Sequence, residues 1–505
     1  MEHCACGIGP TRSLEVTTNL SSFRKGRQRV ASILFFLSKG WRLLGWMSHP
    51  KQSNDTSDTS PTKDTFRHVS EHNATSAVFA RIRRTFLLHK ERARDICSNI
   101  RTWSVHEVGK ERLVRSSAPR NRSRRFGNNM ERNPRDERKE TTHQPGEGTE
   151  LSLVLLGDVM LGRLIDKQLS NVEGSDEHIW GDWLPLLQRK HQIVAANLET
   201  SVCDHRKLPK MPDRVFNFAV LPQNMTKALS KANVAYVSLA NNHVLDFQEE
   251  GLLQTTAALK QNGIHFSGAG KSLHEARDPA ILTENGVNVA FVSVADHPSE
   301  WEAKPGTAGI NFIDPISYKK EDLQHQIKSA RSRVNELGGG MVVVFAHWGP
   351  NWQWRPSEYI VRLGHDMIDC GADIVFGHSS HHIMGVEIYR GKPIVYGAGA
   401  FFDDYAMDES YRNDLGFLYD LQIQQGRPTT LDMYPSMIRH TWRKPNSDPP
   451  YFSTVEKAGD NEARWLRDKL SHLCEDFGTK VQTEELSKFT IKIPAHPGFC
   501  AHGRV

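Results

Sequence analysis

From residue 150 onward the chain contains a series of short apolar runs, and each run stops abruptly at polar residues. The runs are rich in Val, Ile, Leu and Phe, and helical patterns separate them. Nearly continuous apolar runs of strand length are typical of sheet strands that are buried on both faces. The pattern therefore predicts an α/β domain. The runs begin at Leu151, Ile193, Val234, Val287, Met341 and Ala372.

Three segments between or after these runs have the periodicity of amphipathic helices. Residues 250–261 are followed by Gly263, and residues 356–370 are followed by Gly371, in each case at the position of a helix C-cap. The third segment spans residues 462–473, and we expect it to pack on the sheet domain rather than to form a partner groove. Its apolar residues at helical spacing are Trp465, Leu466, Leu470 and Leu473.

Polar side chains with ligand atoms follow several of the apolar runs directly. In open α/β sheets, ligands bind outside the carboxyl ends of the strands, so we expect these side chains to meet at one rim. Carboxylate oxygens, amide oxygens and imidazole nitrogens are ligands that Mn²⁺, Fe²⁺ and Zn²⁺ accept. The sequence therefore predicts a metal site. The residues are Asp158, Glu199, Asn242 with His243, His347, and His378 with His381.

Each of these features also has a simpler interpretation when it is taken alone. A Gly-Asp pair after a strand is commonly a turn, and Glu199 is also typical of the start of a loop. The sequence GHSSHH, from Gly377, is also typical of a surface histidine cluster. The occurrence of all of them at strand ends favours the metal site over these alternatives.

The chain of 505 residues is long enough for two or three domains. Its net charge of +5 conceals two unlike parts, because residues 1–150 hold 28 lysines and arginines against 16 acidic residues, whereas the remainder carries a net charge of −7. Residues 48–78 and 115–150 have too few aliphatic side chains to offset the entropy of ordering the chain. We therefore predict that residues 1–148 form a basic, largely disordered extension.

The composition also bears on partners and compartment. Clustered arginines can neutralise phosphates, but the chain has no aromatic interleaving, zinc-ligand spacing or recognition-helix pattern, so we favour a solvated extension over nucleic-acid binding. No apolar run approaches the ~20 residues that cross a bilayer, so we expect a soluble protein without a transmembrane segment. The basic first 50 residues leave organelle targeting or membrane-surface association open. The seven scattered cysteines do not indicate a disulfide scaffold.

The motifs of the second part resemble those of the CapA family, the poly-gamma-glutamate capsule synthesis proteins of the calcineurin-like metallophosphoesterase superfamily. The resemblance covers roughly residues 150–440. It implies a four-layer α/β/β/α sandwich over residues 149–440, and the amphipathic segment described above predicts that residues 441–505 pack on this domain. The motifs are GDVMLGR, NLE, SLANNHVLD, AHWG, GHSSHH, GIHFSGAG, EARDPAIL and VYGAGAFFDDY.

This resemblance implies one or two divalent metal ions, with Mn, Fe, Zn and Mg as candidates, and it makes His243 the general acid. The ligands that it implies are Asp158, Glu199 and His381 for the first metal, and Glu199, Asn242, His347 and His378 for the second. One position departs from the superfamily pattern of Asp-x-His, because Met160 stands where the histidine is expected. A thioether binds such metals poorly, so we expect the first metal to bind more weakly than the second.

Two functions from different classes remain open at the level of the sequence. In the first, the protein is a metal-dependent hydrolase that acts on a phosphoester or on a gamma-glutamyl-type polymer. In the second, it is a non-catalytic accessory protein for the synthesis or export of a polyglutamate or capsule-like polymer. An anionic small-molecule or polymer substrate needs cationic side chains, although arginines near the motifs are also typical of a plain surface. The candidates are Arg163, Arg355 and Arg412.

Overall fold

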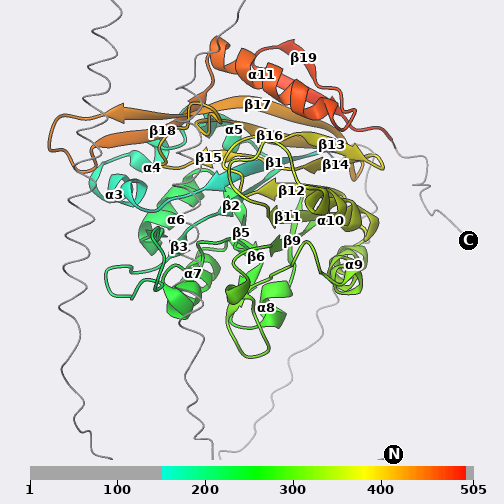
Figure 1. The fold of residues 1–505 in the computed structure, drawn as a ribbon, viewed down its shortest axis with the longest axis horizontal. Helices are drawn as coiled ribbons and strands as arrows, with labels where there is room; N and C mark the ends of the chain where they lie inside the picture. The colour runs from blue at the N-terminus through cyan, green and yellow to red at the C-terminus, as the bar shows by residue number, and fades with distance from the viewer. Residues whose placement is uncertain (1–149, 496–505) are drawn as a thin grey trace, which may run out of the picture. The chain divides into compact units, whose positions relative to one another are not determined.

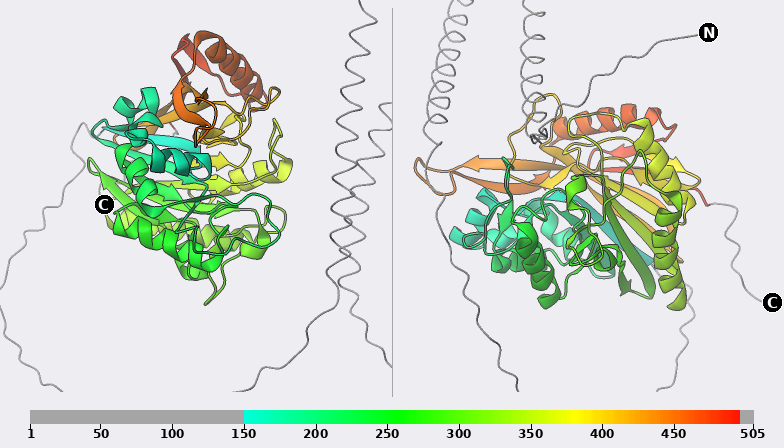
Figure 2. Two further views of the ribbon diagram at one scale, coloured as in Figure 1. Left: turned by 90° about the vertical axis from the view of Figure 1, so that its left-hand side faces the viewer. Right: turned by 60° about the horizontal axis from the view of Figure 1, so that its bottom comes forward.

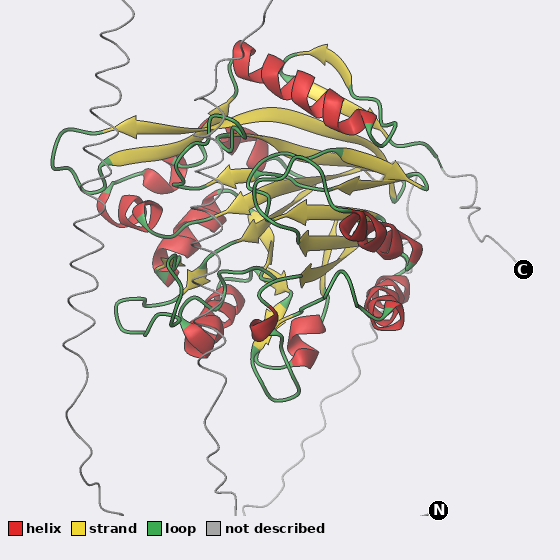
Figure 3. Ribbon diagram, in the orientation of Figure 1, coloured by secondary structure: helices red, strands yellow, loops and turns green. Residues whose placement is uncertain are grey.

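The computed structural model describes residues 150–495, so the predicted extension over residues 1–148 lies outside the described residues. Within residues 150–495, two β-sheets lie face to face, and helices cover their outer faces (Figure 1, Figure 3). The four-layer α/β/β/α arrangement expected from the sequence is confirmed. None of the helices in this range is long and apolar enough to cross a membrane.

The first sheet has ten strands and combines a parallel centre with an antiparallel side. Its strands are β1 (Glu150–Val159), β2 (Gln192–Leu198), β5 (Val234–Ser238), β6 (His265–Ser267), β15 (Ala400–Phe402), β16 (Leu415–Gln424), β17 (Arg427–Trp442), β18 (Tyr451–Lys457), β19 (Gln482–Glu485) and β20 (Lys488–Lys492). The order is β19-β20-β17-β16-β1-β2-β5-β6, with β15 beside β1 and β18 beside β17. Strands β1, β2, β5 and β6 run parallel, so their carboxyl ends lie at the same edge.

The second sheet has six strands in the order β13-β14-β12-β11-β9-β8. Its strands are β8 (Ala280–Glu284), β9 (Val287–Ala295), β11 (Gly340–His347), β12 (Ile374–His378), β13 (Val386–Tyr389) and β14 (Lys392–Val395). Strands β9, β11, β12 and β14 are parallel. Two short pairs stand apart from the main sheets, β3 (Ser201–Val202) with β4 (Ala219–Val220) and β7 (Ala269–Gly270) with β10 (Gly309–Ile310).

The helices fall into groups that separate apolar cores hold in place. Apolar side chains join the outer face of the first sheet to α3 (Leu164–Asn171), α6 (Pro222–Lys231) and α7 (Gln248–Gln261). A second core joins the outer face of the other sheet to α9 (Lys320–Glu336) and α10 (Glu358–Asp369). The shorter helices are α4 (Ser175–His178), η2 (Gly181–Trp183), α5 (Leu184–Leu187), α8 (Leu273–Arg277) and η3 (Ser299–Trp301).

The core between the two sheets is the third and holds the sandwich together. Tyr236 of β5 stacks on Phe291 of β9 with ring centroids 4.1 Å apart, and Phe345 of β11 meets Tyr236 edge-on at 5.5 Å. All three side chains are fully buried, and aromatic side chains of this size dominate core energetics. These contacts clamp strands of opposite sheets at a fixed separation.

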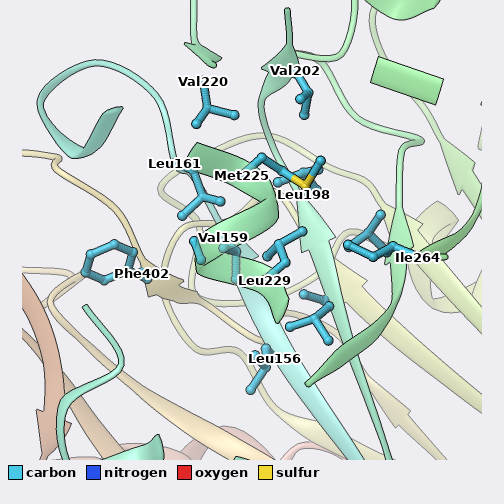
Figure 4. Packing of buried hydrophobic residues seen from close by; sticks show 14 of the residues in the cluster. Leu156, Val159, Leu161, Leu198, Val202, Val220, Met225, Leu229, Ile264 and Phe402 are labelled. Atoms are coloured by element: carbon cyan, nitrogen blue, oxygen red, sulfur yellow. The ribbon is translucent and has the colours of Figure 1, made fainter. Parts of the chain in front are cut away.

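Helix α6 fixes the ends of the two strands that carry the first predicted ligands. Figure 4 shows Met225 and Leu229 of this helix beside Val159 of β1 and Leu198 of β2. All four side chains are fully buried. Val159 follows Asp158 in the chain, and Leu198 precedes Glu199. Because successive side chains of a strand point to opposite faces, the packing of Val159 and Leu198 against α6 directs the neighbouring side chains to the other face of the sheet.

The elements predicted from the sequence are present, with small differences in their ends. Each of the six apolar runs forms a strand, namely β1, β2, β5, β9, β11 and β12, and the structure divides them between two sheets. Helix α7 begins two residues before the predicted start at 250. Helix α10 begins at Glu358 instead of Pro356, because Ser357 has extended backbone dihedral angles and ends the preceding loop.

The carboxyl-terminal part of the described chain is built onto the first sheet. Helix α11 (Asp460–Glu475), the red helix in Figure 2, buries Leu466 and Leu470 in the core between the sheets and contacts β13 and β17. Strand β17 continues through residue 440 to Trp442, and β18 pairs with it in an antiparallel manner. The division into residues 149–440 and 441–505 stays a prediction.

The Leu470→Ala variant should show how strongly α11 is coupled to the central core. Leu470 has no exposed surface, so its truncation should lower the free energy of unfolding by about 2–5 kcal/mol. Chemical denaturation of the full chain measures this value. The control is Leu337→Ala, at the end of α9, where 55% of the side chain is exposed. Equal losses in the two variants would contradict the assignment of α11 to the core.

Candidate metal centre

The register of the strands brings the predicted ligands to one edge of the sandwich. In the first sheet, Asp158 lies opposite Asn197 of β2, which in turn lies opposite Ser238 of β5. In the second sheet, His347 lies opposite His378. Because all of these positions are at carboxyl ends of parallel strands, side chains from both sheets meet in one place.

Asp158 lies at the centre of the group that results. One ligand atom each from Asp158, Glu199 and His381 lie within 4.8 Å of one another, and all three residues are buried. The carboxylate of Asp158 also lies 3.1 Å from Nδ1 of His378 and 3.6 Å from Nδ1 of His381. Four residues that the sequence places on three different strand ends thus form one cluster.

Asn197 connects this cluster to His347. Its side-chain amide donates a hydrogen bond of 2.8 Å to Oδ1 of Asp158, and the same nitrogen lies 3.2 Å from Nδ1 of His347. The carbonyl oxygen of Asn197 accepts a hydrogen bond of 3.2 Å from Asn241, which also donates to the backbone oxygen of Leu198. These amide side chains fix the orientation of the ligands predicted for the first metal relative to those predicted for the second.

Many buried ligand atoms of the cluster make no hydrogen bond to any of residues 150–495. Buried polar atoms are nearly always paired in folded proteins, and leaving them unpaired is costly. A cation that accepts lone pairs would satisfy oxygen and nitrogen atoms together, so the donor set fits a divalent metal ion. The atoms are Oδ2 of Asp158, both carboxylate oxygens of Glu199, Oδ1 of Asn242, Nε2 of His347, both ring nitrogens of His378 and Nδ1 of His381.

The two carboxylates of the cluster have opposite pKa shifts. Burial raises the pKa of Asp158, but the close imidazoles of His378 and His381 outweigh it and bring this pKa well below 3.8. Burial, followed by the negative charge of Asp158, brings the pKa of Glu199 well above 4.5. Burial also lowers the pKa of His347 well below 6.5, so its imidazole is neutral.

His243 lies at the border of the cluster and is oriented by a carboxylate. Its Nδ1 lies 2.6 Å from Oδ2 of Asp246, and its Nε2 lies 3.8 Å from Oε1 of Glu199. The imidazole stacks on Phe218 with centroids 4.0 Å apart. Burial lowers the pKa of His243, whereas Asp246 opposes this shift. The arrangement leaves Nε2 facing the ligands while Nδ1 is held.

Asn242 and Asn241 have different roles in the NNH triplet. The side chain of Asn242 is half-buried, and its carbonyl oxygen makes no hydrogen bond within the described range. Asn241 is fully buried, and its carbonyl oxygen accepts a hydrogen bond of 3.0 Å from the backbone nitrogen of His243. Asn241 therefore shapes the turn, while Asn242 keeps a free oxygen.

The three predicted substrate-binding arginines lie in different surroundings. Arg163 forms an ion pair of 3.3 Å with Asp404, and its guanidinium lies 5.5 Å from the ring of Phe218, which itself contacts His243. Arg355 pairs with Asp476, and Arg412 pairs with Asp414 at 2.8 Å. Of the three, Arg163 is therefore placed beside the ligand cluster, and the role of the arginines in binding stays a prediction.

Several residues of the site lie within the quoted motifs but received no role from the sequence. Asn197 belongs to the NLE motif, and Asp246 ends SLANNHVLD. Asp403 belongs to the FFDDY segment, is buried, and has one carboxylate oxygen without a hydrogen bond in the described part of the chain. Burial raises the pKa of Asp403 to about 7. Motif membership was the available signal, but the functions of these residues depend on contacts between distant segments.

The Met160 side chain has a structural contact of its own. Its sulfur accepts a hydrogen bond of 3.0 Å from the backbone nitrogen of Gly162, and the residue is fully buried. The backbone nitrogen of Met160 donates to the backbone oxygen of Phe402 at 2.9 Å, so Asp403 follows directly beside this position. The thioether therefore helps to hold the turn after β1.

Comparison with known proteins gives matches over the part of the chain that forms the site. The family described as "Bacterial capsule synthesis protein PGA_cap" matches residues 152–405. A probable polyglutamine synthesis accessory protein of Mycobacterium tuberculosis is 33% identical over 60% of this chain and 78% of its own length. Capsule biosynthesis protein CapA of Bacillus anthracis is 27% identical over 56% of this chain and 70% of its own length. PGA biosynthesis protein CapA of Bacillus subtilis is 29% identical over 50% of this chain and 63% of its own length.

The Glu199→Gln variant should stabilise the metal-free protein while weakening its response to metal. The pKa of Glu199 is raised in the folded state, so between pH 4.5 and that higher value the folded protein holds a proton that the unfolded chain has lost. The stability of the metal-free wild type therefore falls as the pH rises through this window. Glutamine does not ionise, so the variant should not lose stability as the pH rises through this window.

Thermal unfolding in a chelator, measured at several pH values and repeated with added metal, tests the expectation. The control is Glu336→Gln, an exposed position in α9. We expect the Glu199→Gln melting temperature to exceed that of the wild type at alkaline pH in the chelator. An equal or lower value, or an undiminished response to metal, would contradict the role given to this carboxylate.

Proposed function

Because the chain belongs to the family of bacterial capsule synthesis proteins, we propose that it acts as a metal-dependent hydrolase on a gamma-glutamyl-type polymer or a phosphoester. The observation that carries this proposal is the buried cluster of Asp158, Glu199 and His381, in which Oδ2 of Asp158, both carboxylate oxygens of Glu199 and Nδ1 of His381 make no hydrogen bond to any of residues 150–495. A site of structural ion pairs would instead match each carboxylate with a donor.

The proposed metal ligands fall into two groups that share Glu199. Asp158, Glu199 and His381 would hold one divalent ion, which is Mn, Fe, Zn or Mg. Glu199, Asn242, His347 and His378 would hold a second. When bound, such an ion lowers the pKa of a water molecule and polarises the attacked centre.

The remaining residues of the site supply orientation and protons. Asp246 holds the imidazole of His243 through Nδ1, and Arg214 lies 3.3 Å from the other oxygen of Asp246. Because Asp246 holds Nδ1, Nε2 of His243 is the atom from which the protonated imidazole would deliver a proton to a leaving group. Arg163, beside the ring on which His243 stacks, provides positive charge for an anionic substrate.

A second candidate function is supported by the name of one relative. The protein of Mycobacterium tuberculosis is described as a probable accessory protein of polyglutamine synthesis. An accessory role would use the metal cluster to bind or hold a polymer without turnover. The two candidates differ in whether a metal-loaded protein hydrolyses gamma-glutamyl peptides or phosphoesters.

Variants of two histidines should separate metal binding from proton transfer. His347→Ala should lower the metal content, because it removes a nitrogen that has no other partner in the described structure. His243→Gln should keep the metal and lower any hydrolytic rate by about 10²- to 10⁴-fold. Elemental analysis, together with assays on a panel of phosphoesters and gamma-glutamyl peptides, measures both properties.

The control for these variants is His265→Ala, at an exposed position of β6, which should change neither property. Loss of metal in His243→Gln to the same extent as in His347→Ala would refute the proton-transfer role. A wild type that binds metal but hydrolyses no member of the panel would favour the accessory function.

The Met160→His variant should change the number of tightly bound metals. With Met160 engaged by Gly162, the first proposed metal has three protein ligands against four for the second, so the wild type should contain closer to one metal than two. A histidine at this position adds an imidazole two residues after Asp158 and should raise occupancy of the weaker site. Titration of the metal-free wild type and variant with metal measures how many ions each binds tightly. Two equally tight metals in the wild type would exclude the weaker first site.

A further inference from the structure

A row of aromatic rings continues outward from the ligand cluster. We call Trp352, Trp354, Tyr411 and Trp465 the aromatic shelf. The ring of Trp352 lies 5.9 Å from that of His381, and Tyr411 lies 5.5 Å from Trp352 and 5.0 Å from Trp354. Trp354 lies 6.3 Å from Trp465, so the partly exposed rings form a continuous row that begins at a proposed metal ligand and ends at α11.

Three separate segments build the shelf, and contacts between them hold its rings in place. Trp352 and Trp354 come from the loop after β11, Tyr411 from the loop after β15, and Trp465 from α11. The hydroxyl of Tyr411 donates a hydrogen bond to the backbone oxygen of Trp352. Trp352 has a φ of 63°, which is costly for a bulky side chain, and 38% of it is exposed. Such strain persists where the surroundings hold it, as at ligand sites.

A lysine without an anionic partner accompanies the rings. The ammonium of Lys469 lies 4.1 Å from the ring centroid of Trp354 and 5.7 Å from that of Trp465. Within residues 150–495 the ammonium group of Lys469 donates no hydrogen bond and forms no ion pair with a carboxylate. The neighbouring Arg355 and Arg412 are instead ion-paired with Asp476 and Asp414. The shelf therefore presents a positive charge that its surroundings leave unneutralised.

We propose that the aromatic shelf and Lys469 bind a segment of a carboxylate-bearing amide polymer beyond the bond that lies at the metal cluster. Amide planes and methylene groups of the chain pack on the indole faces, and a carboxylate of the chain pairs with Lys469. This inference rests on the proposed function, because it assumes that the polymer reaches the cluster. It adds a chain-length dependence that a small-molecule hydrolase would lack.

The composition of the shelf favours this ligand over a polyanion that is held by charge alone. A charge-based site would need several unpaired cations, whereas here the rings outnumber the free ammonium. A ring-based uronate polymer also combines apolar faces with carboxylates, and it serves as the comparison ligand in the test. Polyphosphate, which has charge but no apolar surface, serves as the second.

The experiment measures binding, not turnover, on full-length protein with the His243→Gln change as a background. Calorimetry compares short and long oligomers of gamma-linked glutamate, oligogalacturonate and polyphosphate. We expect the long glutamate oligomer to bind more tightly than the short one. Lys469→Met and Trp352→Ala should each weaken the long oligomer about tenfold and remove the length dependence. The controls are Lys480→Met and Trp442→Ala, both at positions outside the shelf.

Lys469→Met keeps all proposed metal ligands, so its metal content should equal that of the background protein. Affinity that does not depend on oligomer length would overturn the proposal, as would equal losses in the control variants. Tighter, Trp352-dependent binding of oligogalacturonate or of polyphosphate would also overturn it. Because binding is read without catalysis, absence of hydrolysis in the wild type would reject the proposed activity and leave this result standing.

Discussion

The candidate site depends on the burial of the Asp158 carboxylate where the two sheets meet. Its pKa is well below 3.8, because His378 and His381 of the opposite sheet outweigh the cost of burial. An ionised carboxylate in this position requires positive or donating groups on several sides. The parallel register of β1 with β2, and of β11 with β12, provides them, and the central core sets the distance between the sheets.

The proposed binding of metal by the cluster would come at the expense of the stability of the metal-free protein. Oδ1 of Asp158 accepts a hydrogen bond from Asn197 and lies 3.1 Å from His378, whereas Glu199 has no donor within residues 150–495 and its pKa rises. If stability were the sole requirement, hydrogen bonds from the protein would satisfy the buried carboxylate of Glu199. The extensive apolar packing around α6 and between the sheets can tolerate it, since a few unsatisfied groups are small beside such burial.

The parts of the fold and site that depend on local sequence could be predicted, and those that depend on distant pairing could not. Continuous apolar runs predicted β1 and β11, and the residues after them included Asp158 and His347. In contrast, Asp403 reaches the site because β15 pairs with β1 from a distant part of the chain. The division of the strands between two sheets also depends on such pairing, which no local pattern specifies.

The aromatic shelf and the metal cluster differ in how they relate to the family. All proposed ligands lie within residues 152–405, the range that matches the family. Trp465 and Lys469 belong to α11, beyond this range, yet the core that fixes the sheets also fixes α11 through Leu466 and Leu470. A helix that is anchored in this core can carry side chains of the aromatic shelf without disturbing the cluster. Under the proposed function, the chain would thus have a structural means of choosing its polymer separately from the reaction.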